Sequence, residues 1–355
     1  MSARLRTLVQ NGTLALAATA VACAGVEAAV RVLDLAPPLP PRYADYVSND
    51  VLPFRMAANS VGVDRPWPSG EEFAFEFRTN SQGFRDVEHA FEKPPGVFRI
   101  LGLGDSYTAG SGAPLDDSYL YRLERMLRLD RPVEIVKAGQ PRYWTEPERL
   151  LLETVGVKYH PDLVLVGFTP NDVTDTYLGT SAVKVRDGYL VSRDAYDLGH
   201  TGVWLYVHSG AARLLLRAWL DRRSQMGGRG TVATMRPTGV YRADGPHEPD
   251  WQQVEREFEA MLRIVGSIDA RLVLLHIPGP DFRTDDTDYA GRRLAAWGRG
   301  HDVEVIDTMP AIRAAAEHEQ VYWQKDIHCT SAGYRVIAET LYAELTRRHL
   351  VPDPH

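Results

Sequence analysis

The sequence contains very little cysteine. Its 355 residues include two, Cys23 and Cys329, one in an apolar N-terminal segment and one near the C-terminus. An internal disulfide and a thiolate metal site are therefore not expected. No group of histidines has the spacing of zinc ligands either, so we expect no metal. The fold has to be held together by its hydrophobic core.

Long runs of like charge are also missing. The 40 lysines and arginines against 47 aspartates and glutamates give a net charge of −7, and we find no long basic block. Composition therefore does not favour nucleic acid or anionic lipid as a partner. With 44% hydrophobic and 25% charged residues, the chain has the composition of a globular protein that can bury a sizeable core.

One long uncharged segment is present at the N-terminus. Thr7–Val26 carries no charge and follows Arg4 and Arg6. As a helix, these residues would rise about 30 Å, roughly one hydrocarbon thickness. An uncleaved anchor is favoured because the helical pattern continues through Leu33, but a signal peptide cleaved after the A-x-A pattern at 20–22 stays open. Both place the rest of the chain outside the cytoplasm, since the arginines are expected to stay inside.

Three regions follow one another along the chain. Residues 1–33 form the signal-anchor or signal peptide, residues 34–96 a linker and short β-containing lead-in, and residues 97–350 the main domain. In the lead-in, the alternating stretch 72–78 predicts one half-exposed strand. An insertion at about 173–250 interrupts the main domain and is long enough to lie over a site.

The main domain alternates short apolar runs with amphipathic stretches. Strands are expected at 98–103, 133–136, 163–167, 271–277 and 303–306, and helices at 119–129, 146–155, 251–268, 290–297 and 331–345. This alternation predicts an α/β fold with a mostly parallel sheet covered on both faces.

A serine follows the first of these strands. Gly104-Asp105-Ser106 comes directly after the apolar run, where α/β sheets place ligand chemistry, and a loop of small residues follows at 108–112. A turn or helix-cap serine is one alternative. A nucleotide loop is another, but Tyr107 stands where its third glycine would be. We interpret Ser106 as a candidate nucleophile.

Residues near later strand ends would complete an acyl-transfer site. The Asn171 amide can direct an N–H at an oxygen that becomes negative, and Gly139 can add a backbone N–H. His328, two residues after Asp326, can take the proton of Ser106 while the carboxylate fixes its tautomer. The alternatives are ordinary turn chemistry for the asparagine, a glycine required for positive φ, and a surface histidine beside a helix cap.

Together these residues resemble the motif blocks of the SGNH, or GDSL, hydrolase superfamily. Gly104–Ser106 matches the first block, Ala138-Gly139 the second, Gly167–Asp172 the third and Asp326–His328 the fifth, in the same order and strand contexts. The resemblance covers roughly residues 99–345. It implies a three-layer α/β/α flavodoxin-like parallel sheet without a cofactor, to which this chain adds the N-terminal membrane helix.

The resemblance also implies a role for each residue. Ser106 would be the nucleophile, and its own N–H, the Gly139 N–H and the Asn171 side chain would form the oxyanion hole. His328 would be the base and Asp326 its partner.

Some features resemble a membrane-anchored bacterial envelope subgroup. The segment 78–85 is similar to one that precedes the hydrolase domain in those members. One residue rather than two separates Asp326 from His328, a spacing similar to that of envelope polysaccharide O-acetyltransferases. Arg142 replaces a common glycine, where it could narrow the pocket or bind an anionic group.

The expected function is a serine esterase that hydrolyses short-chain esters, acetyl first, on a cell-envelope glycan through an acyl-serine intermediate. An O-acetyltransferase acting on envelope polysaccharide and a catalytically idle carbohydrate-binding module are the alternatives. The expected partners are an acylated small molecule or glycan and, through the N-terminal helix, the membrane, but no nucleic acid.

Overall fold

The computed structural model describes residues 3–37, 39, 43–66, 72–178, 183–192, 199–227, 247–282 and 288–353. The chain divides into two compact units, one formed by residues 1–39 with 191–235 and the other by residues 40–190 with 236–355.

Five strands form the central sheet of the larger unit. They are β5 (Phe98–Gly104), β6 (Val133–Lys137), β7 (Leu163–Phe168), β10 (Arg271–His276) and β11 (Glu304–Asp307). Their order is β11-β10-β7-β5-β6, and every neighbouring pair is parallel. Nearly all residues of β5 and β7 are buried, as in strands covered on both faces. The predicted α/β class and all five predicted strands are confirmed.

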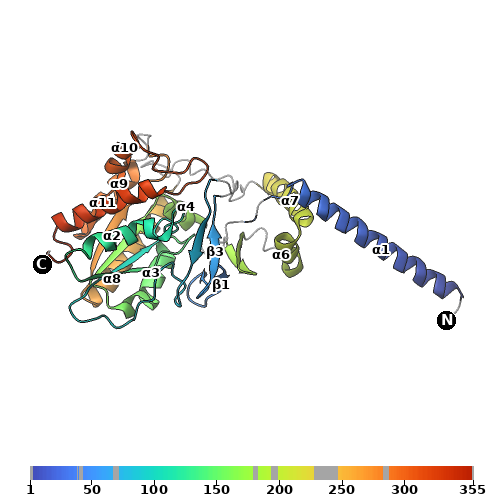
Figure 1. Ribbon diagram of the computed structural model, residues 1–355, viewed down its shortest axis with the longest axis horizontal. Coiled ribbons are helices and arrows are strands. Elements are labelled where there is room, and N and C mark those ends of the chain that lie inside the picture. The colour runs from blue at the N-terminus through green and yellow to red at the C-terminus, as the bar shows by residue number, and fades with distance from the viewer. Residues whose placement is uncertain are drawn as a thin grey trace. The chain divides into compact units, whose positions relative to one another are not determined.

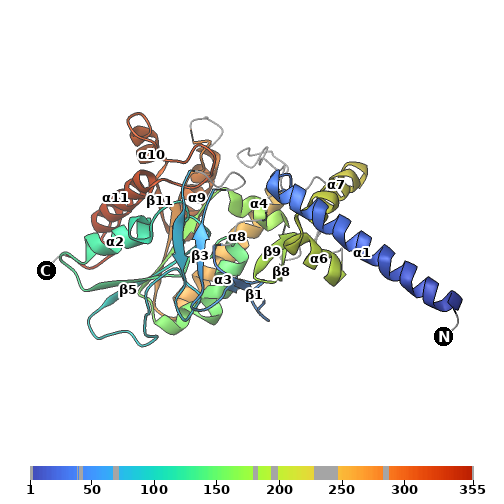
Figure 2. The same ribbon diagram turned by 45° about the vertical axis from the view of Figure 1, so that its right-hand side comes forward.

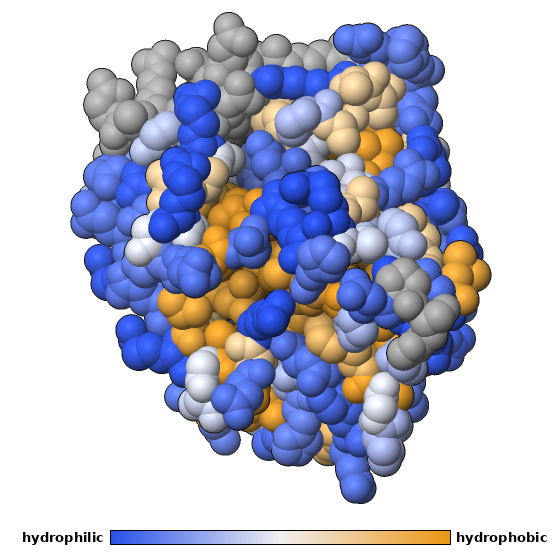
Figure 3. Space-filling model, turned by 90° about the vertical axis from the view of Figure 1, so that its left-hand side faces the viewer, coloured by the Kyte–Doolittle hydropathy of each residue, from blue (hydrophilic) through white to orange (hydrophobic). Residues whose placement is uncertain are grey.

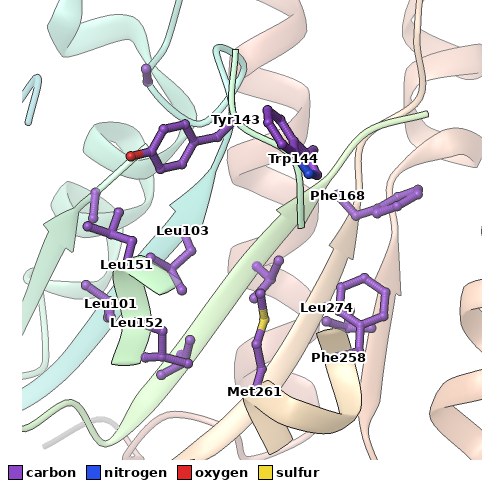
Figure 4. Packing of buried hydrophobic residues seen from close by; sticks show 14 of the residues in the cluster. Leu101, Leu103, Tyr143, Trp144, Leu151, Leu152, Phe168, Phe258, Met261 and Leu274 are labelled. Atoms are coloured by element: carbon purple, nitrogen blue, oxygen red, sulfur yellow. The ribbon is translucent and has the colours of Figure 1, made fainter. Parts of the chain in front are cut away.

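Helices cover both faces of this sheet (Figure 1). One face packs on α2 (Tyr119–Leu127), α10 (Met309–Ala315) and α11 (Ser331–Arg347), and the other on α3 (Thr145–Thr154), α8 (Glu248–Ser267) and α9 (Asp288–His301). Successive strand residues point to opposite faces of the sheet. Ile100 therefore packs in the core between the sheet and α2, α10 and α11, and Leu101 packs in the core on the opposite face. Figure 4 shows Leu101 and Leu103 of β5 beside Leu151 and Leu152 of α3. The three-layer α/β/α arrangement is therefore confirmed.

The lead-in forms two small antiparallel hairpins. The first pairs β1 (Tyr46–Val47) with β2 (Arg55–Met56), and the second pairs β3 (Val61–Asp64) with β4 (Phe75–Arg78). The strand predicted within 72–78 is β4. Phe54 and Phe77 belong to the same hydrophobic core as Leu101, so the lead-in packs as part of the sheet's own core.

The remaining elements of the larger unit are short. They are the 3₁₀ helices at Leu115–Asp117 and Gly156–Tyr159, α4 (Asn171–Leu178), β8 (Val183–Arg186) and the start of β9 (Tyr189–Ser192). On the face shown in Figure 3, hydrophobic side chains are visible between polar ones, which is ordinary for a protein surface.

The smaller unit contains α1 (Ala3–Val32), α6 (Gly199–His208) and α7 (Gly210–Gly227) (Figure 2). Among the described residues, α1 is the helix that is long and apolar enough to cross a membrane, from Arg4 to Val32. The expected insertion at 173–250 falls partly in this unit. Its residues 179–182, 193–198 and 228–246 lie outside the described residues.

Candidate active site

Ser106 lies in the sharp turn that follows β5. Gly104 adopts φ +150°, and a Cβ there would come within 2.0 Å of Thr108 Oγ1, so only glycine allows this turn. The Ser106 Oγ atom lies 2.8 Å from Nε2 of His328, which comes from the loop before α11. The end of the strand thus presents the hydroxyl directly to the imidazole.

Asp326 orients this imidazole. Its Oδ1 accepts the Nδ1–H of His328 at 2.5 Å and the backbone N–H of the same residue at 2.9 Å. Because an ionised carboxylate only accepts, Nδ1 carries the proton and Nε2 can accept the proton of Ser106. The bond to the backbone closes a tight turn for which one intervening residue, Ile327, is enough. The short spacing therefore leaves the Asp–His pair intact.

Tyr107 supports the same loop from the nucleophile side. Its hydroxyl donates to the carbonyl of Ile327 at 2.5 Å, and its ring centroid lies 5.1 Å from that of His328. Both rings are buried. Tyr107, which stands where a nucleotide loop would have a glycine, thus fixes the position of the loop that carries His328.

The pKa of His328 is raised above its usual value. Burial of the ring acts in the opposite direction, but the hydrogen bond and charge of Asp326 and the charges of Asp64 and Asp105 outweigh it. A histidine that acts as a base must be neutral, so activity is expected to rise with pH through this raised pKa.

Asn171 is held beside the serine turn. Its Nδ2 donates to Asp105 Oδ2 at 2.9 Å, and Thr169 Oγ1 donates to Asn171 Oδ1 at 2.6 Å, which fixes the orientation of the amide. The Asn171 side chain also hydrogen-bonds the carboxyl group of Asp175, which lowers a pKa that burial of Asp175 raises. Nδ2 carries two hydrogens, so it can serve both neighbouring carboxyl groups.

Two further carboxyl groups are buried near this turn. Asp172 Oδ2 accepts the backbone N–H of Thr169 at 2.8 Å, whereas neither oxygen of Glu148 has a hydrogen-bond partner in the part of the chain that the structure describes. Burial, together with the charge of Asp105, raises the pKa of both well above the usual range. Burial therefore favours the neutral form of both carboxyl groups.

Gly139 is required for close approach rather than for positive φ. A Cβ at this residue would lie 2.4 Å from the backbone nitrogen of Ala109, so only glycine lets this loop approach the serine loop. The neighbouring amides are engaged, since Ala138 donates to Gly102 and Gln140 donates to Gly104.

The backbone N–H groups of Gly139 and Ser106 form no hydrogen bond within the described residues. A buried backbone donor is rarely left without a partner, so two such donors in adjacent loops fit an oxyanion hole. The structure thus brings Ser106, His328 and Asp326 into one hydrogen-bonded chain, with Gly139 in a neighbouring loop and Asn171 at the start of α4 beside the serine turn.

The lead-in is built into the site, and sequence analysis missed this. Buried Arg85 donates to the carbonyls of Ala109 at 3.2 Å, Gly110 at 2.6 Å and Ala113 at 3.0 Å. Buried Asp64 accepts the backbone N–H of Gly112 at 2.7 Å. Two opposite charges from the lead-in therefore hold the small-residue loop that follows Ser106.

A second connection joins the lead-in to the Gly139 loop. Gln140 Nε2 donates to the carbonyl of Gly83 at 3.0 Å, and its Oε1 accepts the N–H of Met56 at 3.0 Å. Gly83 and Arg85 lie in or at the end of the segment 78–85, whose similarity to other proteins was the available signal. Asp64 carries no comparable signal in the sequence.

Asp64→Asn is expected to shift the acid limb of the kcat/KM profile to lower pH. The substitution keeps the size of the side chain but removes a charge that raises the pKa of His328. A lower pKa leaves the base neutral, and the enzyme active, at lower pH. The profile should be measured beside Asp116→Asn, which changes an exposed carboxylate. A folded Asp64→Asn protein with an unchanged acid limb would show that Asp64 does not act on the histidine.

The sequence profile of the GDSL-like lipase/acylhydrolase family matches residues 103–336. The chain belongs to this family. It is therefore an SGNH-type ester hydrolase, and the matched range agrees with the extent of the motif resemblance. No functionally curated protein matches the sequence significantly.

Several solved structures match the chain at low identity. A structure of TesA is 12% identical, with a TM-score of 0.43, and the match covers 70% of this chain and 98% of that one. A lipase/acylhydrolase from Enterococcus faecalis is 16% identical over 71% and 96% of the two chains, with a TM-score of 0.40. A catalytic mutant of Axe2, an acetylxylan esterase from Geobacillus stearothermophilus, is 13% identical over 70% and 94%, with a TM-score of 0.42.

Proposed function

We propose that this hydrolase is a serine esterase that removes short acyl groups, acetyl first, from a cell-envelope glycan. The observation that supports it most directly is the hydrogen-bonded chain from Asp326 through His328 to Ser106. The arrangement supplies a nucleophile, a base and an orienting acid within hydrogen-bond distance of one another. This intact machinery does not favour a catalytically idle carbohydrate-binding module.

In the acylation half of the reaction, Ser106 Oγ attacks the carbonyl carbon of the ester while its proton passes to His328 Nε2. The carbonyl oxygen becomes negative and takes hydrogen bonds from the amides of Ser106 and Gly139 and from Asn171 Nδ2. His328 then gives the proton to the alcohol oxygen as the bond between carbonyl carbon and alcohol breaks. An acyl-serine and a free alcohol result.

The second half of the reaction regenerates the serine. A water molecule loses a proton to His328 Nε2 and attacks the acyl-serine through the same oxyanion intermediate. When this intermediate collapses, the proton returns to Ser106 Oγ and the carboxylic acid leaves. A sugar hydroxyl in place of water would give the O-acetyltransferase reaction, for which the short Asp–His spacing is the specific feature.

Bulky side chains near the serine favour a small acyl group. Tyr107 follows the nucleophile directly, Trp144 is buried near the second loop, and Arg142 is exposed between them in sequence. Arg142 adopts φ +73°, a backbone conformation that glycine adopts freely and arginine does not. An arginine kept in this strained conformation fits a role at the substrate, either by narrowing the pocket or by binding an anionic group.

The purified protein is expected to hydrolyse acetyl and propionyl p-nitrophenyl esters with a higher kcat/KM than long-chain esters. An acetylated glycan should lose acetate without any acceptor sugar. Similar kcat/KM values for long chains would contradict the small-acyl proposal and indicate lipid substrates. Turnover that requires an acceptor sugar would instead establish the transferase.

We also propose that the larger unit, which contains the candidate active site and is called the catalytic unit below, lies outside the cytoplasm and is held there by α1 as an anchor. The length and apolar character of this helix and the two arginines before its uncharged stretch support the proposal. The cleaved signal peptide remains the competing proposal. Carbonate-resistant membrane association of the mature protein distinguishes the anchor from the signal peptide.

A further inference from the structure

Helix α7 is joined to the far end of α1 by a set of polar contacts. The carboxylate of Glu27 accepts the Ser209 hydroxyl at 2.7 Å and the backbone N–H groups of Gly210 and Ala211, each at 2.9 Å. It thereby satisfies donors that the first turn of a helix leaves open, and its negative charge suits the positive end of the helix dipole. Glu27 is the first charged residue after the uncharged stretch of α1.

Two arginines extend this junction. Arg31 Nη2 donates to the carbonyl of His208, and Arg213 Nε donates to the carbonyl of Pro37, at 2.9 and 2.7 Å. Figures 1 and 2 both show α7 beside this end of α1. The end of α6 and the start of α7 therefore lie where α1 would leave a bilayer.

Large apolar side chains are exposed on these two helices. Trp204 and Leu205 on α6 are 50% and 38% exposed, and Leu215 and Trp219 on α7 are 71% and 48% exposed. Leu215 and Trp219 are four residues apart and thus share one face of α7. Tryptophan is enriched where a protein meets the membrane–water interface, since its ring is apolar and its N–H is polar.

The charge of α7 differs in sign from that of the chain. The helix carries four arginines (Arg213, Arg217, Arg222 and Arg223) and one aspartate, whereas the whole protein has a net charge of −7. Arginines beside exposed leucine and tryptophan are a combination found in segments that lie in a bilayer interface. The arginines complement the phosphates of anionic lipids.

We propose that α6 and α7 form a membrane-surface element that lies in the headgroup region of the bilayer that α1 crosses. The exposed Trp204, Leu205, Leu215 and Trp219 enter the boundary of the acyl chains, and Arg217 and Arg222 of α7 contact lipid phosphates. This inference rests on the proposed anchoring by α1. It assigns part of the insertion to the membrane surface rather than to a cover over the active site.

The proposal can be tested by lipid quenching in the full-length chain. Single cysteines at Leu205 or Leu215, in a Cys23→Ser background where Cys329 is buried, would carry an environment-sensitive fluorophore. The protein would be reconstituted into phosphatidylcholine vesicles with and without phosphatidylglycerol, with a quencher on the acyl chains. Leu16→Cys reports on α1 itself, and Leu129→Cys is a matched exposed leucine of the catalytic unit.

Labels at positions 205 and 215 are expected to reach about half the quenching seen at position 16, because interfacial helices enter about 5–10 Å into the boundary. Arg217→Gln with Arg222→Gln should reduce this quenching in vesicles that contain phosphatidylglycerol. Quenching at 16 without quenching at 205 and 215, or equal quenching at 129, would overturn the membrane-surface element and leave the anchor standing. Absence of quenching at 16 would overturn the anchor, and this proposal with it.

Discussion

Ser106→Ala is expected to reduce ester hydrolysis by at least about 10⁴-fold, because catalysis through a nucleophile and its base fails when either one is removed. The hydroxyl is the group that lies 2.8 Å from His328 Nε2. His328→Ala should be nearly as damaging, because the described residues place no other base against the Ser106 hydroxyl. Labelling by a fluorophosphonate should disappear in both variants.

Ser111→Ala provides a matched control in the same loop. Ser111 is buried, and its Oγ has no hydrogen-bond partner among the described residues, so its hydroxyl can be removed without breaking a bond. This variant should hydrolyse esters and accept the label like the wild type. All variants must show the wild-type melting transition. If a folded Ser106→Ala protein still turned over esters and still became labelled, the nucleophile would be another residue.

The sequence predicts the fold and the main candidate residues for a common physical reason. In a parallel sheet covered on both faces, strands are short apolar runs, and polar residues directly after them lie at one edge. Ser106 and Asn171 follow β5 and β7, which are hydrogen-bonded neighbours, and the structure places Asp105 between them. Asp326 and His328 are only two residues apart in the sequence, and this short separation was enough to predict that their side chains pair.

Other parts of the site depend on packing that no local pattern contains. Arg85 and Asp64 act through backbone groups of the loop after Ser106, and such contacts leave no periodicity in the sequence. Gly139 is a glycine because another backbone approaches it, whereas the alternative interpretation assigned it to positive φ. Helix α10 was missed because its seven residues are too few to show helical periodicity.

Removing the Asn171 side chain should weaken stabilisation of the oxyanion while Ser106 is still activated by His328. Asn171→Ala is expected to lower kcat by about 10²- to 10³-fold with a small change in KM, the usual effect of removing one oxyanion donor. Ser106, His328 and Asp326 keep their contacts in this variant, so the serine should still become labelled by a fluorophosphonate, although more slowly.

The matched control for this substitution lies on the same helix. Thr174→Ala removes a hydroxyl that donates to the backbone carbonyl of Asn171 at 3.0 Å, and it leaves the amide itself in place. Thr174→Ala should retain kcat within a fewfold of the wild type, with the melting temperature measured for both variants. Asn171→Ala also removes a hydrogen bond to buried Asp105, so some loss of stability is expected. A folded Asn171→Ala protein with wild-type kcat would show that the oxyanion is stabilised by the backbone amides of Ser106 and Gly139 without this side chain.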